Sequence, residues 1–517
     1  MYPRTHALTN PDKVAARLVE TGEQLSYAEL EERSTRLAHL LREAGLRRGD
    51  VVALLSNNDL RCFEVYWAAM RSGLYITAVN HHLVADEVAY IVNDSGAKAL
   101  VASAAKGELA AAIVALTPSV ELRLAFGGEV AEHGDYAKAL ASASAEPLVD
   151  EPSGAPMLYS SGTTGRPKGV RPPLPERQVH QPGEMVVGLA GSVFGMDADS
   201  VYLSPAPIYH AAPLRWSGAV QALGGTVIMT ERFDAERTLA AIEDHRVTAG
   251  QFVPTMFVRM LKLDEEVRTR YDVTTLKLAI HAAAPCPVDV KHKMIDWWGP
   301  VLVEYYAGTE GHGMTMITSP QWLEKPGSVG KAVVGVLHIC DEQGAEVPVG
   351  EVGTVYFERD LVPFSYHNDP EKTRAAQHPE HPTWTTVGDI GRVDADGFLF
   401  LTDRKAFTII SGGVNIYPQE IENVLALHPA VTDVAVIGVP DEEMGESVKA
   451  FVQPAPGVVV GADLENEIIE FVRSKIARFK APRSVAFVDQ LPRTPTGKLV
   501  KGELKQRYLD GVLPTSG

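Results

Sequence analysis

The segment YSSGTTGRPKG (159–169) carries the most distinctive pattern in the chain. It follows the apolar residues PMLY (156–159), which predict a strand, so the loop is expected at the edge of a sheet. Three glycines allow a tight turn that aims backbone N–H groups inward, and the serines and threonines add short neutral donors. Lys168 adds a positive charge suited to a polyphosphate. The segment therefore predicts a phosphate-binding loop, although Pro167 and Gly169 around the lysine differ from a Walker A loop.

Length and composition limit the class of protein. A chain of 517 residues exceeds what one hydrophobic core supports, so at least two domains are expected. Hydrophobic residues make up 45% and charged residues 22%, as in ordinary globular proteins. The 66 acidic residues outnumber the 48 basic ones, which argues against a nucleic-acid partner or a polybasic membrane surface. The three cysteines have no spacing typical of a disulfide framework or a zinc site, so we expect buried free thiols.

Targeting signals are not recognised in the chain. The first residues, MYPRTHALTN, lack the apolar stretch of a signal peptide, and the last, VLPTSG, carry no retention or peroxisomal tripeptide. The stretch ALVASAAKGELAAAIVAL, interpreted as helical, contains Lys106 and Glu108 and is a poor membrane span. We therefore expect a cytoplasmic location without integral membrane association, and we leave a homodimer open.

Strand and helix signals alternate along most of the chain. Ser26 and Glu29 form a capping box before a helix that Gly45 ends. Short apolar stretches between helical patterns predict strands: VVALL (51–55), YITAV (75–79), ALVAS (99–103), GTVIM (225–229), GQFV (250–253), LKLAI (276–280) and VLVEY (301–305). Such alternation predicts an α/β domain of helix-flanked β-sheets over residues 1–403. Two strands at 433–453, a helix at 464–478 and a strand at 484–488 predict a small α+β domain over 404–517.

The loop at 159–169 resembles the phosphate-loop signature of the adenylate-forming superfamily, which includes acyl-CoA synthetases, carrier-protein adenylation domains and beetle luciferases. Further segments match that family in order over nearly the whole chain. The resemblance implies that the following residues contact ATP: Ser160, Ser161, Gly162, Thr163, Thr164, Gly165 and Lys168.

Two segments resemble the family's substrate and nucleotide contacts in the large domain. In EYYAGTE (304–310), the resemblance implies that Tyr306 stacks on adenine, Thr309 reaches the α-phosphate or carboxylate, and Glu310 holds Mg²⁺. Ala307 replaces the family's usual glycine. In PIYH (207–210), His210 would lie beside the acid, and a core histidine is the competing interpretation. The implied acyl pocket comprises His210, Ala211, Ala212, Trp216, Ala282 and Ala307.

The remaining nucleotide contacts come from three further segments. In HAAAPCP (281–287) the resemblance implies that Ala283, Ala284 and Pro285 edge the adenine. Tyr305 is counted both among the ATP contacts and among the candidates for the acid pocket. In WTTVGD (384–389), the resemblance implies that Asp389 accepts hydrogen bonds from both ribose hydroxyls. In the following segment DRK (403–405), it implies that Arg404 also contacts the ribose. Val387 replaces the family's threonine.

The small domain carries residues that resemble those of both half-reactions. Ser411, Gly412 and Gly413 match the glycine loop that lines the pantetheine tunnel for coenzyme A, where glycines leave room for a thiol. Lys498 matches the adenylation lysine, a cation that offsets charge repulsion between the carboxylate and the α-phosphate. The family rotates this mobile domain about a hinge, here Ala406, although Ala406 and Phe407 replace the usual charged residues.

The resemblance implies an ATP-dependent acid:CoA ligase with Lys498, Glu310, His210 and Thr309 as catalytic residues and Mg²⁺ and coenzyme A as further requirements. The pocket candidates contain no Lys or Arg, which favours a hydrophobic monocarboxylic acid, fatty or steroid-derived, over a dicarboxylate. An aryl-acid ligase, a stand-alone carrier-loading enzyme, a luciferase-like oxygenase and a regulatory nucleotide-binding protein are the alternatives.

Overall fold

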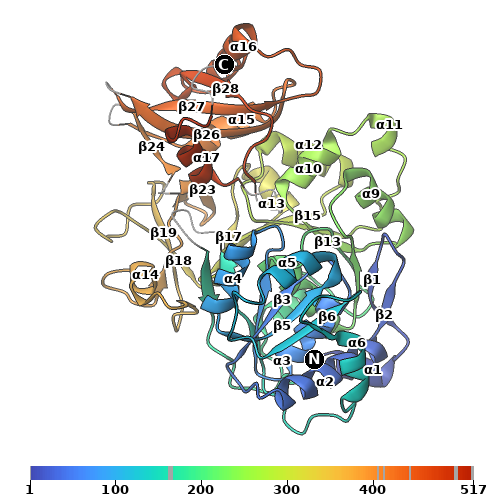
Figure 1. Ribbon diagram of the computed structural model, residues 1–517. Coiled ribbons are helices and arrows are strands. Elements are labelled where there is room, and N and C mark those ends of the chain that lie inside the picture. The colour runs from blue at the N-terminus through green and yellow to red at the C-terminus, as the bar shows by residue number, and fades with distance from the viewer. Residues whose placement is uncertain are drawn as a thin grey trace.

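The computed structural model describes residues 2–160, 167–404, 407–411, 414–441, 444–493 and 499–513, and in these ranges the side chains of Ser160, Asp403, Arg404 and Asn415 are not described. A large part of the molecule contains two sheets with helices on their faces, and the C-terminal segment forms a smaller part above it (Figure 1).

The first sheet has six parallel strands in the order β7-β6-β5-β3-β4-β8. Every residue of β3 and β4 is buried, because a parallel sheet covered on both faces needs continuous apolar strands. The Ser26 hydroxyl and the Glu29 carboxylate cap helix α2 reciprocally, as the sequence predicts. The bounds are β3 Val51–Leu55, β4 Tyr75–Val79, β5 Ala97–Ser103, β6 Leu122–Phe126, β7 Gly134–Asp135, β8 Ala155–Pro156, α1 Pro3–Thr9, α2 Tyr27–Glu43, α3 Arg61–Met70, α4 Ala85–Asp94, α5 Gly107–Ala112 and α6 Tyr136–Ser142.

The second sheet has nine strands in the order β17-β16-β15-β14-β13-β11-β12-β1-β2, parallel in the middle and antiparallel at both edges. Strand β1 joins it from the start of the chain, where Ala16 pairs with Val227. The bounds are β1 Val14–Leu18, β2 Gln24–Ser26, β11 Val201–Ser204, β12 Thr226–Met229, β13 Ala249–Phe252, β14 Leu278–His281, β15 Leu302–Ala307, β16 Met314–Thr318, β17 Lys331–Val334, α7 Met185–Gly188, α8 Ala211–Leu223, α9 Ala235–Asp244, α10 Pro254–Leu261, α11 Glu265–Arg268, α12 Val288–Trp298 and α13 Ser319–Glu324.

Helices and the two sheets alternate in layers. Helices α3 and α8 pack in one core with the inner faces of both sheets, to which Val52 and Leu54 of β3 also point. Their neighbours Val51, Ala53 and Leu55 point to the opposite face, where α4 and α5 cover the first sheet. Helices α9, α10 and α12 cover the outer face of the second sheet. The space between the sheets is therefore closed by α3 and α8.

Two small sheets follow in the chain. The first pairs β9 and β10, which flank residues 161–166 in the sequence, with β20 and so brings the start of helix α14 beside Lys168 of β10. The second contains five antiparallel strands ending at β23. The bounds are β9 Leu158–Ser160, β10 Lys168–Arg171, β18 Val336–Cys340, β19 Gly353–Glu358, β20 Ser365–Tyr366, β21 Trp384–Thr385, β22 Asp389–Val393, β23 Leu399–Arg404 and α14 Pro370–Ala375.

The C-terminal part is one five-stranded sheet with three helices, coloured orange to red in Figure 1. The bounds are β24 Ile409–Ser411, β25 Val414–Ile416, β26 Val431–Asp441, β27 Gly445–Pro454, β28 Ser484–Phe487, α15 Pro418–Leu425, α16 Ala462–Arg473 and α17 Lys501–Leu509. Lys262 of the large part donates to the Val431 carbonyl oxygen at 3.0 Å. The predicted fold class, a large α/β part and a small α+β part, is thus confirmed, while the boundary at residue 403 stays a prediction.

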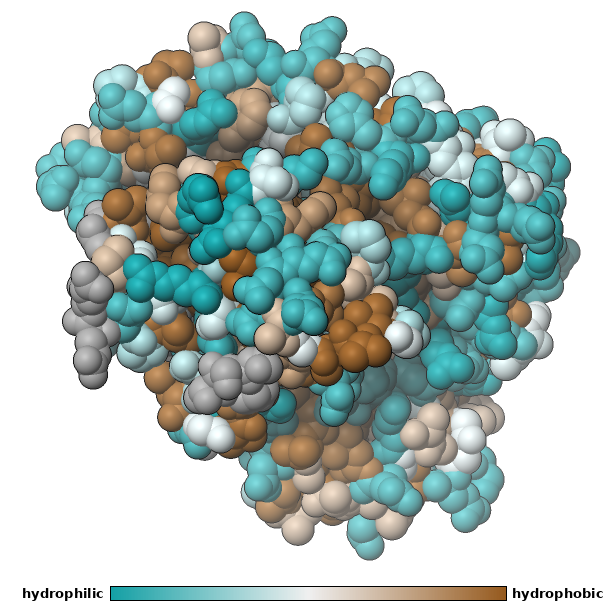
Figure 2. Space-filling model, turned by 90° about the horizontal axis from the view of Figure 1, so that it is seen from above, coloured by the Kyte–Doolittle hydropathy of each residue, from teal (hydrophilic) through white to brown (hydrophobic). Residues whose placement is uncertain are grey.

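Other sequence predictions concern the surface and the thiols. Cys62 and Cys340 are buried and Cys286 is half-buried, all as free thiols. The stretch interpreted as one apolar helix is divided between strand β5 and helix α5, and no helix in the described ranges is long and apolar enough to cross a bilayer. The face seen from above is mostly hydrophilic, with hydrophobic patches between the hydrophilic side chains (Figure 2). This surface agrees with a net charge of -18.

Candidate active site

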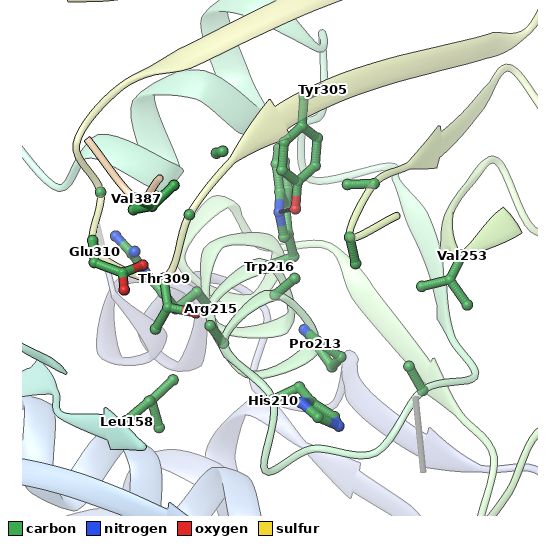
Figure 3. Close-up of a pocket in the computed structure, with 18 of the residues that line it drawn as sticks. Leu158, His210, Pro213, Arg215, Trp216, Val253, Tyr305, Thr309, Glu310 and Val387 are labelled. Atoms are coloured by element: carbon green, nitrogen blue, oxygen red, sulfur yellow. Dashed lines mark hydrogen bonds between the residues drawn. The ribbon is translucent and has the colours of Figure 1, made fainter. Parts of the chain in front are cut away.

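A cavity of about 750 Å³ lies where strands β13, β14 and β15 end and helix α8 begins. Both large sheets line it, through Ala78 of β4 on one side and Gln251 of β13 on the other. Figure 3 shows Thr309 and Glu310 at one side of this space, Tyr305 and Trp216 together at another, and His210 beyond Pro213. The carboxyl ends of parallel strands are the usual ligand site in α/β proteins, so we treat this cavity as the candidate active site.

His210 occupies the N-cap of helix α8 and lines the cavity. A buried asparagine holds the segment that leads to it: the Asn58 side chain donates to the Ala206 and Thr230 carbonyl oxygens at 3.1 and 2.8 Å and accepts from the Ile208 N–H at 2.7 Å. Asn58 could not be predicted from the sequence, because no motif surrounds it. The N-terminus of a 13-residue helix carries partial positive charge, which suits a bound carboxylate.

All six predicted acyl-pocket residues line this cavity. The sequence analysis missed further apolar lining from the segment around α7, including Met185, Val186 and Leu189. One expectation needs correction, since Arg215 also lines the cavity although the candidates contained no Lys or Arg. Arg215 follows Ala212 by three residues on helix α8, a spacing that puts both on one face and could have predicted its place. Its guanidinium lies 3.6 Å from the Glu184 carboxylate, so its charge is paired.

Tyr305 and Tyr306 point to opposite sides of strand β15, as successive residues of a strand do. The Tyr306 hydroxyl donates to Asp389 Oδ2 at 2.7 Å, which joins two of the predicted nucleotide contacts. The Tyr305 hydroxyl instead accepts from Gln251 Nε2 at 2.9 Å and Trp216 Nε1 at 3.3 Å. Tyr305, counted from the sequence both among the ATP contacts and among the pocket candidates, therefore lies with the residues of the predicted acyl pocket.

The loops that follow strands β14 and β15 line the nucleotide side of the cavity. Ala283, Ala284, Thr309 and Glu310 contribute to its wall, whereas Pro285 is exposed and lies outside the lining. Ala283 has a φ of 74°, in the left-handed region that residues with a Cβ seldom adopt. A β-branched residue would be more strained than alanine at this position.

Charged side chains gather beside the phosphate loop. Lys168 forms an ion pair with Asp369, the N-cap of α14, and the bond from Lys168 holds the pKa of that carboxyl below its usual value. Lys372 of α14 lines the cavity, and burial followed by the charge of Lys168 lowers its pKa. The Tyr366 hydroxyl donates to Glu310 Oε1 at 2.9 Å. Two ammonium groups, of Lys168 and Lys372, and two carboxylates, of Asp369 and Glu310, thus lie in this part of the site, and ammonium groups of this kind could bind a polyphosphate.

A buried ion pair, which was not predicted from the sequence, joins helix α12 to strand β15. Lys291 of α12 donates to Glu304 Oε2 at 2.6 Å, and neither side chain is more than 6% exposed. Burial raises the pKa of Glu304, and the nearby Lys291 opposes that shift. His281 Nε2 lies 3.8 Å from the same carboxylate, and burial lowers its pKa well below the usual value. His281 is the last residue of β14 and Glu304 lies within β15, so this cluster links the two strands that lead into the nucleotide segments.

Several predicted site residues lie outside the described residues, and their roles stay predictions: Ser161, Gly162, Thr163, Thr164, Gly165, Ala406, Gly412, Gly413 and Lys498. The same holds for the side chains of Ser160 and Arg404. Ser411, the last residue of β24, is buried in the small part.

A metal ion at this site would depend on Glu310. Within the described ranges no three His, Cys, Asp or Glu side chains form a group able to hold a metal ion. Mg²⁺ bound with a nucleotide usually takes one or two carboxylates and completes its shell with phosphate oxygens and water. A single carboxylate at the cavity wall therefore fits Mg²⁺ and does not fit a metal held by protein alone.

Comparisons with known proteins agree with this geometry. The chain matches the family described as "AMP-binding enzyme" over residues 3–366 and the "AMP-binding enzyme C-terminal domain" over 420–498. It is 34% identical over 516 residues to a feruloyl-CoA synthase of Amycolatopsis sp, covering 98% of both chains. It is 32% identical to the long-chain-fatty-acid–CoA ligase FadD13 of Mycobacterium tuberculosis, over 98% of this chain and 97% of that one. Its fold superposes on ATP-bound MatB from Rhodopseudomonas palustris with a TM-score of 0.81 and 28% identity over 99% of each chain.

Proposed function

Because the chain belongs to the AMP-binding enzyme family and is an AMP-forming acid–thiol ligase, we propose that it activates a hydrophobic monocarboxylic acid and transfers the acyl group to coenzyme A. The acid would carry a ring or a long chain, as ferulate and long-chain fatty acids do in the names of two relatives.

The observation that carries the proposal is the lining of the cavity beyond His210. This wall is apolar because small and hydrophobic side chains form it: Ala211, Ala212, Ala282, Ala307, Met185, Leu189 and Trp216. Its one arginine, Arg215, faces Glu184, so a second carboxylate would have to break that pair. These features support an acid with one carboxylate and an uncharged body.

In the first half-reaction the acid's carboxylate attacks the α-phosphorus of ATP, forming acyl-AMP and releasing pyrophosphate. The N-terminus of α8 and His210 would orient the carboxylate, and Thr309 would hold it or the α-phosphate. Lys168, Lys372 and the phosphate loop would bind the departing pyrophosphate. Mg²⁺ at Glu310 would supply further neutralisation of the phosphate charge. Lys498 would bridge the two reacting anions from the small domain.

In the second half-reaction the thiol of coenzyme A attacks the acyl carbon, AMP leaves, and the thiol proton goes to solvent. Tyr306 and Asp389, joined by their hydrogen bond, would hold the adenosine through both steps. Ser411, Gly412 and Gly413 would line the path of the thiol. The catalytic contribution of the protein is orientation and charge stabilisation, with no covalent enzyme intermediate.

The test is a screen of fatty, aryl and steroid-derived acids by pyrophosphate release, followed by thioester formation with each active acid. Acid-dependent pyrophosphate release together with consumption of coenzyme A would support the proposal. Pyrophosphate release without consumption of coenzyme A would show a carrier-loading enzyme instead. Preference for a dicarboxylate would reject the proposed substrate class.

A further inference from the structure

Four buried polar side chains form a chain of hydrogen bonds at the wall of the acyl pocket. The Tyr202 hydroxyl donates to Gln251 Oε1 at 3.1 Å, and Gln251 Nε2 donates to the Tyr305 hydroxyl at 2.9 Å. Trp216 Nε1 donates to the same hydroxyl at 3.3 Å. Three of these residues, Gln251, Tyr305 and Trp216, line the cavity.

The direction of each hydrogen bond follows from the chemistry of the groups. An indole N–H can only donate, so Trp216 uses one lone pair of the Tyr305 oxygen. Tyr202 is fully buried, and Gln251 Oε1 is the acceptor that its proton reaches among the described residues. Reversing the Gln251 amide would leave the Tyr202 proton without an acceptor, so Gln251 also donates to Tyr305.

The Tyr305 hydroxyl thus accepts two hydrogen bonds and still has its own proton to donate. Within the described ranges, no side chain or backbone group accepts that proton. Tyr305 is only 9% exposed, and Figure 3 shows its oxygen directed toward Trp216 and the pocket. Burial raises the pKa of Tyr305, so the hydroxyl keeps its proton at neutral pH. A buried donor without an acceptor is costly, and a ligand that accepts from it removes that cost.

We infer that Tyr305 donates a hydrogen bond to an uncharged acceptor oxygen on the part of the acid distant from its carboxylate, and so selects acids that carry a carbonyl, ether or hydroxyl oxygen there. The inference rests on the proposed function and narrows its substrate class. An uncharged acceptor fits best because Arg215, which lines the same cavity, is already paired with Glu184 and so offers no free charge to a second carboxylate. Unsubstituted acids of the same shape would bind in the same pocket but leave the donor unsatisfied.

The test uses acids matched in shape: para-methoxycinnamic against para-ethylcinnamic acid, and a cyclohexanone-propanoic acid against its exo-methylene analogue. For each pair, kcat/KM for pyrophosphate release is measured with the wild-type enzyme and with Tyr305→Phe. We expect the wild type to prefer the oxygenated member roughly tenfold, and the preference to fall to about one in Tyr305→Phe. If Tyr305 has only a structural role, Tyr305→Phe should lower kcat/KM equally for both acids of a pair and leave the ratio of the two values unchanged.

Trp216→Phe is the matched control. It removes a neighbouring hydrogen bond from the same oxygen but leaves the Tyr305 proton free to donate, so the oxygenated member should stay preferred. The inference would be overturned if the wild type showed a kcat/KM ratio near one for the two acids of a pair, or if the ratio were unchanged in Tyr305→Phe. Turnover of the acids would still support the proposed function in either case. Absence of pyrophosphate release with every acid would reject both.

Discussion

The buried pair of Lys291 and Glu304 allows a sharp test of how the nucleotide segments are held. Lys291→Met keeps the length and apolar stem of the side chain but removes the ammonium group 2.6 Å from Glu304 Oε2. It leaves a carboxylate that is only 4% exposed without its partner. Removing one member of a buried ion pair typically costs about 3–5 kcal/mol of stability, because the remaining charge is uncompensated. We expect a loss in this range near neutral pH.

The pH dependence of that loss follows from the Glu304 carboxyl. Burial raises its pKa, and Lys291 is the group that lowers it. In Lys291→Met the effect of burial is unopposed, so the pKa in the folded state lies further above the unfolded value of about 4.3. A carboxyl with a raised pKa destabilises the fold only when it ionises. The difference from wild type should therefore be small below about pH 4.3 and should grow as the pH rises.

The assay is urea unfolding followed by tryptophan fluorescence, with Trp322, whose ring centroid lies 4.8 Å from the Lys291 ammonium, as a nearby probe. The matched control is the double variant Lys291→Met with Glu304→Met, which replaces the pair by apolar groups of similar volume. Such replacements are often neutral or stabilising, so the double variant should recover most of the loss. If it is no more stable than Lys291→Met, or if the single variant loses less than about 1 kcal/mol, the pair does not have the assigned role.

Three further substitutions test the assigned roles in catalysis. Lys498→Ala should abolish acyl-AMP formation but spare thioester formation from synthetic acyl-AMP and coenzyme A; an equal loss in both steps would contradict its role in adenylation alone. Glu310→Gln should raise the Mg²⁺ concentration needed for pyrophosphate release, since an amide lacks the charge that the cation prefers; an unchanged titration would remove Glu310 from the metal site. Ala283→Val should lower kcat/KM for ATP about tenfold, because a β-branched residue at a φ of 74° is strained by about 1–2 kcal/mol. Ala283→Gly should stay active, and Ala284→Val, at a neighbour that also lines the cavity but lacks the positive φ, should be affected less.

The fold could be predicted from sequence where the signal is local. The apolar segments VVALL and YITAV coincide with β3 and β4, because strands buried on both faces read as continuous apolar stretches between glycine-ended helices. The assignment of strands to sheets could not be predicted. Strand β1 joins β12 across 211 residues at the pair Ala16 and Val227, and no local pattern identifies such a partner. The division of the α/β part into two sheets therefore needed the structure.

The site shows the same limit at the level of single residues. Motif residues such as Thr309 and Glu310 could be found because the chemistry needs them at fixed spacing, whereas Asn58 and Lys291 act through partners distant in the sequence. Tyr305 is an intermediate case. Because successive side chains of a strand point to opposite faces, the sequence predicts that Tyr305 and Tyr306 lie on opposite sides of β15. Only one of them can therefore lie on the same side as Asp389. Which one does so, and what the other meets, depends on Gln251 and Trp216. The specificity proposed for this pocket thus depends on long-range contacts, whereas the residues proposed for adenylation belong to motifs that can be recognised in the sequence.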